Sequence, residues 1–361
     1  MSNPQFHKLT VKDIRKETET CVSVAFTIHE EIKSLYKYEA GQYITIKKEI
    51  NGEEVRRSYS LCSSPIEQDF RVAIKQIHAG RFSTFANKEL KIGDVLEVMN
   101  PMGNFTTAIN KNSTKHYMAF AAGSGITPMM SIIKTVLAEE PMSSFTLTYG
   151  NQNFYSIIFR EQIEALKNKY MGRFQVFHVL SRERMESEVN YGRINAEKCE
   201  QLFSKLVDMN TINKYFLCGP EEMIMSVKGY LESKKVASSA IHFELFTSEG
   251  STKAKEAFQE THKADAGKMS IVTIKVDDRS IEIPLAFGGE TILDAALRMG
   301  ADLPYACKGG VCCTCRAKVT EGTVAMEVNY ALDKDEVENG FVLTCQAHPT
   351  SERVVIDFDA R

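Results

Sequence analysis

The first hundred residues alternate between hydrophobic and polar positions with the two-residue period of β-strands. This pattern runs through residues 7–28, 41–63 and 91–100, and the dipeptide Asn51-Gly52 lies where a tight hairpin turn would form. Many short strands separated by turns are typical of a small antiparallel β-barrel. The pattern therefore predicts a barrel domain over residues 1–110.

From about residue 115, short hydrophobic runs alternate with segments of helical period. The expected strands are 116–123, 145–150, 174–180, 214–219 and 241–246, and the expected helices are 128–140, 157–170, 194–203 and 221–235. Strands that alternate with helices form parallel sheets with helices on both faces. The pattern therefore predicts a doubly wound α/β domain over residues 111–247.

The chain becomes polar and rich in Ala, Lys, Glu and Thr over residues 248–268, which predicts a linker. After it, residues 269–285 have the pattern of a β-hairpin, 290–300 that of a short helix and 353–359 that of a strand. These elements predict a third domain, of mixed helices and strands, over residues 269–361.

Composition excludes several classes of protein. The 361 residues have a formal net charge of −3, so no basic surface points to nucleic acid as a partner. No hydrophobic run approaches the roughly 20 residues that cross a bilayer, and the N-terminal residues lack the pattern of a signal peptide. We therefore expect a cytoplasmic protein with no membrane partner, whose nine cysteines are poor candidates for disulfides.

Four cysteines of the third domain have the spacing of an iron–sulfur site. Cys307, Cys312 and Cys315 form C-x4-C-x2-C, and Cys345 follows 29 residues later, which is the plant-type spacing for a [2Fe–2S] cluster. Cys313 is left out because including it would break this spacing. A structural zinc site is the alternative, although zinc sites more usually pair two C-x2-C segments and only Cys312 to Cys315 forms one.

Two segments of the first domain suit a flavin dinucleotide. Residues 57–60 are Arg-Ser-Tyr-Ser, in which the guanidinium can pair with a pyrophosphate and the Tyr ring can lie on an isoalloxazine. Residues 80–83 would begin a helix, whose first backbone N–H groups bind phosphate well. The tetrapeptide alone is weak evidence, because an ordinary strand with an exposed Arg has the same pattern.

Two segments of the second domain suit a nicotinamide dinucleotide. Residues 123–128, Gly-Ser-Gly-Ile-Thr-Pro, follow a strand and precede a helix, and residues 217–220, Leu-Cys-Gly-Pro, follow a later strand. Ser181 and Arg182 follow the third strand, where an Arg can bind a 2′-phosphate and so favours NADPH. A buried core cysteine is the alternative for Cys218, and a solvated loop is the alternative for Ser181 and Arg182.

Together these segments resemble the ferredoxin–NADP reductase superfamily, extended by a C-terminal plant-type ferredoxin domain of α+β, β-grasp-like fold. The resemblance implies that NADPH passes a hydride to FAD and that electrons then reach the cluster singly. It implies catalytic roles for Ser60, Cys218 and Glu244. It implies FAD contacts from Arg57, Ser58, Tyr59, Ser60, Ile74, Lys75, Gln76, Gly80, Arg81, Phe82, Ser83, Thr127 and Phe246. It implies NADP contacts from Gly123, Ser124, Gly125, Thr127, Pro128, Ser181, Arg182, Cys218, Gly219 and Pro220.

The order of the three domains resembles the reductase components of bacterial multicomponent oxygenases, with FMN in place of FAD as an alternative. Within that family the segments are most similar to the reductases of phenylacetyl-CoA epoxidases, which implies a di-iron oxygenase as the electron acceptor. A reductase for a Rieske oxygenase, such as a steroid hydroxylase, is the alternative. A redox sensor is a remote one, because the chain has no spare segment for an output domain. We expect the acceptor to bind near Tyr305, Lys308 and Arg316.

Overall fold

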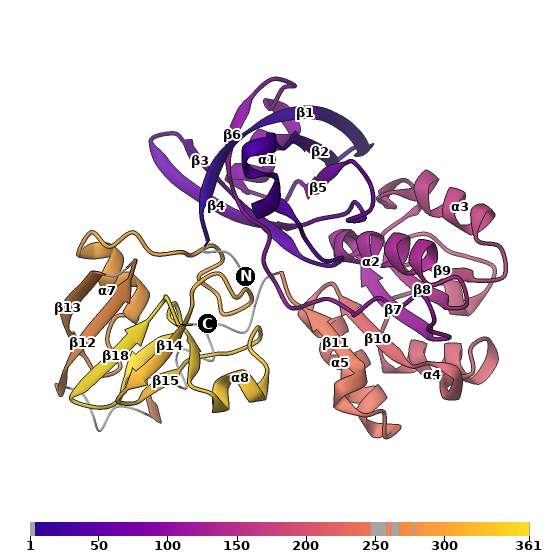
Figure 1. Cartoon of the computed structure of the whole chain (residues 1–361). Coiled ribbons are helices and arrows are strands. Elements are labelled where there is room, and N and C mark those ends of the chain that lie inside the picture. Colours follow the sequence, from indigo (N-terminus) through magenta and orange to yellow (C-terminus); the bar gives the residue numbers. More distant parts are fainter. Residues whose placement is uncertain (1–3, 247–257, 259, 262–266, 278, 361) are drawn as a thin grey trace. The chain divides into compact units, whose positions relative to one another are not determined.

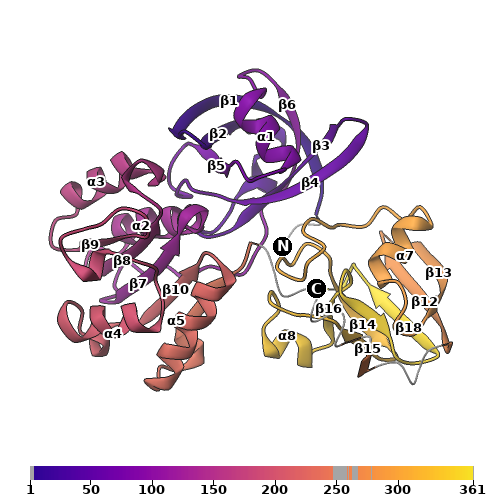
Figure 2. The same ribbon diagram turned by 180° about the vertical axis from the view of Figure 1, so that it is seen from behind.

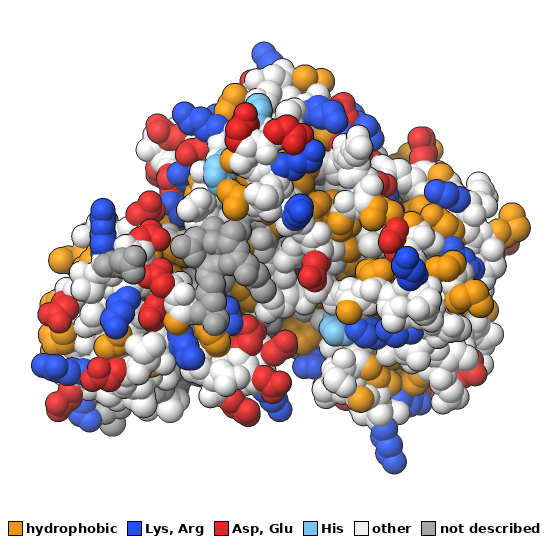
Figure 3. All heavy atoms as spheres, in the orientation of Figure 1, with side chains coloured by type: hydrophobic (Ala, Val, Ile, Leu, Met, Phe, Trp, Pro, Cys, Tyr) orange, Lys and Arg blue, Asp and Glu red, His pale blue; other side chains and the backbone are white. Residues whose placement is uncertain are grey.

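The computed structural model describes residues 4–246, 258, 260–261, 267–277 and 279–360 (Figure 1). The chain divides into two compact units, one from Phe6 to Leu245 and one that contains the residues from Phe246 onward together with those before Phe6. Charged side chains of both signs are interspersed over the face seen in Figure 3. Among the described residues, no helix is long and apolar enough to span a bilayer.

The first unit begins with a six-stranded antiparallel sheet in the order β4-β3-β6-β1-β2-β5. Leu61, which directly follows β4, forms an isolated antiparallel bridge with Val72 of β5 and so connects the two ends of the sheet. The predicted turn at Asn51-Gly52 is confirmed, because both residues have positive φ and join β3 to β4. The elements are β1 (Phe6–Thr18), β2 (Cys21–Thr27), η1 (Glu30–Tyr36), β3 (Tyr43–Ile50), β4 (Glu53–Ser60), β5 (Phe70–Lys75), α1 (Arg81–Lys88) and β6 (Val95–Met99).

The same unit continues into a five-stranded parallel sheet in the order β11-β10-β7-β8-β9, as the alternating pattern predicts. Helices α2 and α3 cover one face and α4 and α5 the other (Figures 1 and 2). Because β7 and β10 are neighbours, the strand order reverses between them, and ligands bind at such a reversal. The strands are β7 (His116–Ala122), β8 (Ser144–Asn151), β9 (Phe174–Leu180), β10 (Lys214–Cys218) and β11 (Ile241–Glu244). The helices are η2 (Gly123–Gly125), α2 (Ile126–Glu139), η3 (Phe154–Ser156), α3 (Arg160–Lys169), η4 (Glu188–Asn190), α4 (Ala196–Lys205), η5 (Met209–Thr211), α5 (Glu221–Ser233) and η6 (Ser238–Ala240).

One helix begins later than its sequence pattern predicts. The expected helix over 157–170 begins at Arg160, because Phe159 has a left-handed backbone with φ of 60°. The preceding residues form the short helix η3 instead, and the Asn153 side chain caps it by accepting a hydrogen bond from the Ser156 backbone. Local capping therefore overrides the helical pattern of the apolar residues Ile157 and Ile158.

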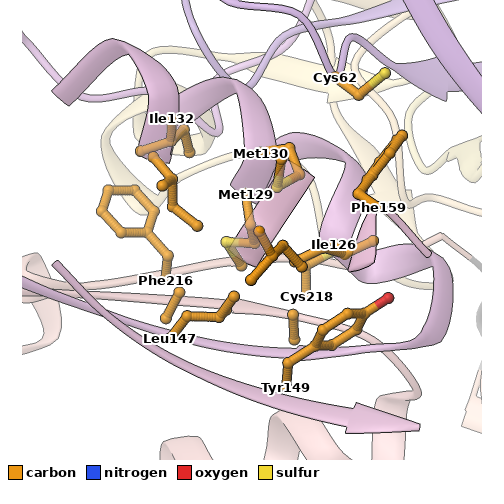
Figure 4. Packing of buried hydrophobic residues seen from close by; sticks show 14 of the residues in the cluster. Cys62, Ile126, Met129, Met130, Ile132, Leu147, Tyr149, Phe159, Phe216 and Cys218 are labelled. Atoms are coloured by element: carbon orange, nitrogen blue, oxygen red, sulfur yellow. The ribbon is translucent and has the colours of Figure 1, made fainter. Parts of the chain in front are cut away.

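The barrel and the parallel sheet share buried contacts. The Ser131 hydroxyl of α2 donates a hydrogen bond of 2.6 Å to the Ser63 carbonyl, and the Ser64 and Thr135 hydroxyls are 2.7 Å apart. Cys62 lies in the same hydrophobic cluster as α2 and the facing side of the sheet (Figure 4). This packing explains why residues 6–245 form one compact unit.

The second unit contains a five-stranded sheet in the order β13-β12-β18-β14-β16 and a two-stranded sheet of β15 and β17. The predicted hairpin, helix and final strand are confirmed as β12–β13, α7 and β18. Most of the predicted linker lies outside the described residues, but Phe258 is buried and its ring lies 4.8 Å from that of His348. The elements are β12 (Met269–Val276), β13 (Arg279–Ala286), α7 (Ile292–Arg298), β14 (Arg316–Glu321), β15 (Val324–Met326), α8 (Lys334–Glu338), β16 (Phe341–Leu343), β17 (Ala347–Pro349) and β18 (Arg353–Asp357).

Candidate functional site

Strand β4 carries the predicted flavin tetrapeptide at its end. Arg57 is exposed and its guanidinium donates to the Arg56 carbonyl at 2.7 Å, whereas Ser60 is buried. Ser58 shares a hydrogen bond of 3.1 Å with Thr45 on β3. The Tyr59 ring lies 5.7 Å from the Phe82 ring of α1. The strand therefore brings the tetrapeptide beside the first turn of α1.

The start of α1 presents the backbone N–H groups of a first helical turn, as a phosphate site requires. Gly80 is the N-cap, and the Ser83 hydroxyl lies 3.3 Å from both the Ile77 amide and the Gly80 carbonyl. A Cβ on Gly80 would lie 2.4 Å from the Ser83 hydroxyl, so a side chain there would force Ser83 to move. Arg81 forms an ion pair with Glu53. Because the first N–H groups of a helix have no intrahelical partner, this turn fits a pyrophosphate.

Strand β5 ends in three predicted flavin residues that the structure separates. Ile74 is fully buried in the barrel core, and Gln76 bonds to Thr20 and Thr84. The Lys75 ammonium lies 3.3 Å from the position that a Cβ on Gly123 would occupy. The structure therefore places the Lys75 charge at the loop predicted for the nicotinamide dinucleotide.

That loop joins β7 to α2, and two glycines are needed in it. Gly123 has a φ of 54°, and a Cβ on Gly125 would lie 2.0 Å from the Cys218 carbonyl oxygen. The Thr127 hydroxyl donates to the Ser124 carbonyl at 3.0 Å. Pro128 lies in the first turn of α2, where its missing N–H costs no hydrogen bond.

A buried tyrosine that the sequence analysis did not single out supports this loop. The Tyr149 hydroxyl, on β8, donates a hydrogen bond of 3.0 Å to the Gly123 carbonyl. Figure 4 shows Tyr149 and Cys218 pointing from the sheet toward α2. Only the tertiary pairing of β7 with β8 brings Tyr149 to this loop, so no local sequence signal could have identified it.

The three residues with expected catalytic roles lie together. Cys218 and Glu244 are register partners on β10 and β11, and the Ser60 hydroxyl donates to the Glu244 carboxylate at 3.3 Å. Burial raises the pKa of Glu244 to about 8, and the bond from Ser60 opposes this shift. Burial also raises the pKa of the Cys218 thiol well above its usual range. The group is therefore largely uncharged near neutral pH.

Three further predicted cofactor residues follow β10 and β11 in the chain. Gly219 and Pro220 follow β10, and Pro220 is the N-cap of α5. A Cβ on Gly219 would lie 2.7 Å from the Met223 side chain. Phe246 is exposed and belongs to the second compact unit.

The loops after β8 and β9 are joined by hydrogen bonds near the predicted 2′-phosphate site. The Ser181 and Arg182 amides donate to the carbonyls of Asn151 and Gln152 at 2.9 and 2.8 Å. The Glu183 carboxylate accepts a bond of 2.8 Å from the Phe154 amide. Arg182 is exposed at this junction. The sequence analysis missed Gln152 and Glu183, because each forms a hydrogen bond with the loop that follows a neighbouring strand, and this contact depends on the tertiary structure.

The four predicted cluster ligands converge in the second unit. The Cys307 and Cys312 sulfurs are 3.1 Å apart, and the Gly309 amide donates to the Cys307 sulfur at 3.3 Å. Hydrogen bonds with Cys312, Cys345 and backbone amides lower the pKa of Cys307, and contact with Cys307 raises the pKa of Cys312 and Cys345. Sulfurs in mutual contact, with amide donors beside them, fit a [2Fe–2S] cluster.

Neighbouring side chains support the ligand segments. The Thr344 hydroxyl donates to the Cys315 carbonyl at 2.9 Å, and the Gln346 amide donates to the carbonyls of Lys308 and Cys345. The Cys313 sulfur, by contrast, donates to the Ala331 carbonyl at 3.2 Å. The structure therefore groups the four predicted ligands and directs Cys313 to another partner.

The residues of the predicted acceptor surface are held by aromatic rings and carboxylates. The Lys308 ammonium lies 4.8 Å above the Tyr305 ring and 2.7 Å from Asp294. The Arg316 guanidinium lies 3.6 Å above the Phe341 ring. Arg316 also pairs with Glu336 at 3.0 Å. These cations are therefore fixed in direction beside the ligand loop.

A cavity of about 980 Å³ lies elsewhere in the first unit. It is lined by the β1–β2 turn and by the segment from Gln152 to Gln162. None of the predicted cofactor residues, all of which are among the described residues, lines it.

Three family models match consecutive parts of the chain. An oxidoreductase FAD-binding domain matches residues 8–107, an oxidoreductase NAD-binding domain matches 120–229, and a 2Fe-2S iron-sulfur cluster binding domain matches 274–350. The expectation of these three cofactor-binding domains is therefore confirmed. The cluster domain also decides against the zinc alternative.

Relatives match the chain along nearly its whole length. The chain is 43% identical to a component protein of the 1,2-phenylacetyl-CoA epoxidase of Escherichia coli (strain K12), over 99% of this chain and 98% of that one. It is 31% identical to the 3-ketosteroid-9-alpha-monooxygenase ferredoxin reductase component of Rhodococcus rhodochrous, over 97% and 96%. The solved structure of phthalate dioxygenase reductase aligns with a TM-score of 0.59 at 22% identity, over 98% of both chains. The predicted three-domain fold is confirmed.

Proposed function

The chain belongs to the ferredoxin reductase superfamily of oxidoreductases, and we propose that it is the reductase component of a phenylacetyl-CoA epoxidase. In this role it passes electrons from NADPH, through FAD and a [2Fe–2S] cluster, to the oxygenase component. The observation that carries the proposal is the identity of 43% with the Escherichia coli epoxidase component along the full chain. The reductases of ketosteroid monooxygenases match over the same length at 31% identity or less.

The bound groups supply the redox chemistry, since a flavin exchanges one or two electrons and a [2Fe–2S] cluster exchanges one. The chain's own residues bind and orient these groups. The start of α1 and Arg57 suit the flavin pyrophosphate, and Tyr59 suits the flavin ring. Ser60, Cys218 and Glu244 lie together where the flavin and nicotinamide rings would meet, and the Ser60 hydroxyl donates to the Glu244 carboxylate. Cys307, Cys312, Cys315 and Cys345 would bind the cluster.

We propose NADPH as the electron donor. Arg182 is exposed at the junction of the loops after β8 and β9, and an Arg there can form charge-assisted bonds to a 2′-phosphate. The Lys75 ammonium beside Gly123 suits the pyrophosphate of the same nucleotide. This extends the expected role of Lys75 from the flavin to the nicotinamide site.

A reconstitution experiment tests the proposed acceptor. The purified chain, NADPH and the oxygenase component of a phenylacetyl-CoA epoxidase are mixed with phenylacetyl-CoA, and the oxygenated product is measured. We expect turnover that needs all four components. The chain's own activity is checked with cytochrome c as an artificial acceptor. Reduction of cytochrome c without product formation would contradict the choice of oxygenase and leave the reductase activity standing.

The second candidate is a reductase for a 3-ketosteroid monooxygenase, as the matches at 29–31% identity suggest. Replacing the epoxidase oxygenase by a ketosteroid oxygenase and its steroid substrate separates the two candidates. Faster turnover with the steroid system would favour this second function.

We also propose a cytoplasmic location. All nine cysteines lie among the described residues, and each is a free thiol. Free thiols and a cluster bound by thiolates are typical of reducing compartments.

A further inference from the structure

The fifth cysteine of the third domain, Cys313, has no part in the ligand spacing, and its partner is a short segment far along the chain. Its sulfur donates to the carbonyl of Ala331 at 3.2 Å and is buried. We define residues 327–332 (Glu-Val-Asn-Tyr-Ala-Leu) as the bridging segment. Its contacts on both sides explain what the Cys313 bond does.

On one side the bridging segment contacts the ligand loop, residues 307–315. The Tyr330 amide donates to the Gly310 carbonyl at 3.1 Å. Gly310 has a φ of 71°, and a Cβ there would lie 2.8 Å from the Val328 side chain. The backbone of the segment thus packs closely against the loop that carries three of the four ligands.

On the other side the bridging segment contacts the strand that follows the fourth ligand. The Glu327 amide donates to the Gln346 carbonyl at 2.9 Å. The Glu327 carboxylate lies 2.8 Å from the His348 ring, and both side chains are almost fully buried. Gln346 directly follows Cys345, so this side of the segment is connected to the remaining ligand.

The bridging segment is also braced internally. The Asn329 side chain accepts bonds from the amides of Ala331 and Leu332 and donates to the Leu332 carbonyl at 3.0 Å. These bonds hold the Ala331 carbonyl in the direction of Cys313. The bridging segment therefore has a backbone conformation held by Asn329, and it contacts both parts of the domain that carry predicted ligands.

We propose that Cys313 is a positioning residue for the cluster. Its thiol holds the bridging segment against the ligand loop, which keeps Cys312 and Cys315 facing Cys345 and slows the loss of iron. The inference rests on the [2Fe–2S] domain and on the four assigned ligands, and it is independent of which oxygenase accepts the electrons. Cys313 contributes a hydrogen-bond donor to this arrangement, so a serine should replace it and an alanine should not.

The test compares Cys313→Ala and Cys313→Ser in the full-length holoprotein. Release of iron to a ferrous chelator is timed, and amide exchange of the peptide containing residues 327–332 is measured by mass spectrometry. We expect Cys313→Ala to release iron about threefold faster, since a thiol is a weak donor whose loss costs less than that of an ordinary hydrogen bond, and to exchange faster in this peptide. We expect Cys313→Ser to stay within about twofold of the wild type. Cys199→Ala, which removes a buried thiol of α4, is the matched control and should release iron at the wild-type rate.

Equal iron release from Cys313→Ala and the wild type would overturn the proposal, and so would equally fast release from the alanine and serine variants. Should Cys313→Ala fail to assemble, Asn329→Ala tests the same contact, because it removes the bonds that direct the Ala331 carbonyl and leaves the cysteine in place. If a folded Asn329→Ala variant then released iron at the wild-type rate, the proposed role of Cys313 would be overturned. A purified wild type without iron would overturn the ligand assignment itself, whatever the oxygenase assay gives.

Discussion

The Ser60 hydroxyl donates a hydrogen bond of 3.3 Å to the Glu244 carboxylate, across 184 positions of sequence. Ser60 ends a strand of the barrel and Glu244 ends a strand of the parallel sheet. The bond therefore joins the flavin-binding and nucleotide-binding domains through two of the residues proposed to have catalytic roles.

The raised pKa of Glu244 predicts a pH dependence. With a pKa of about 8, the carboxyl is mostly protonated at pH 7 and ionises as the pH rises through 8. An ionised Glu244 would keep the Ser60 proton directed toward itself and add a negative charge at the site. We expect the rate of flavin reduction by NADPH, followed by stopped flow, to fall as the pH rises through about 8. In Glu244→Gln this fall should disappear, because an amide does not ionise.

The same shift predicts how stability changes with pH. Since the folded pKa exceeds the ordinary value of 4.5, the folded protein binds the proton more tightly than the unfolded chain. The wild type should lose stability relative to Glu244→Gln as the pH rises from about 4.5 to about 8, with a limiting slope of about 1.4 kcal/mol per pH unit. A difference between their thermal midpoints that is constant across this range would contradict the assignment.

Arg182 should distinguish NADPH from NADH. Loss of a charge-assisted contact to the 2′-phosphate costs about 1.5–3 kcal/mol, which corresponds to a rise in KM for NADPH of about ten- to a hundredfold. Arg182→Ala should leave the KM for NADH nearly unchanged. Arg184→Ala, an exposed Arg of the same loop, is the matched control. Equal losses with both nucleotides would show that Arg182 does not bind the 2′-phosphate.

Tyr149 should affect both nucleotides alike. Tyr149→Phe removes the hydroxyl that supports the Gly123 carbonyl and keeps the buried ring. We expect the Kd of NADPH and of NADH to rise about fivefold each, with little change in kcat. Tyr215→Phe is the control, because its hydroxyl bonds to Met209 at 3.4 Å, away from this loop. Unchanged nucleotide binding in Tyr149→Phe would remove the tyrosine from the site.

Replacing a cluster ligand should separate the two redox centres. Cys345→Ala should lose the [2Fe–2S] absorbance and EPR signal, and with them the electron transfer to cytochrome c. NADPH-dependent reduction of ferricyanide, which the flavin alone can carry out, should remain. Retention of a wild-type EPR signal would contradict Cys345 as a ligand.

Sequence periodicity predicted the strands and helices well, because their burial follows the local pattern. The presence of a 2Fe-2S domain was equally predictable, since plant-type cysteine spacing is a feature of the sequence itself. The delayed start of α3 could not be predicted from the sequence, because it depends on the left-handed backbone of Phe159 and on the cap at Asn153. The positions of Lys75, Tyr149 and Glu183 were also inaccessible, since each side chain meets a loop from another part of the chain. Phe258 likewise stands within a polar stretch whose average composition conceals its burial.

The hydroxyl contacts between the loop at 63–64 and helix α2 have a practical consequence for protein engineering. A chimaera cut between the barrel and the parallel sheet would leave Ser131 and Thr135 without their partners and expose the cluster that contains Cys62. A cut after Leu245 would leave this packing intact. The natural exchangeable module is therefore the flavin–nucleotide pair as one piece, to which ferredoxin domains of different acceptor preference can be grafted.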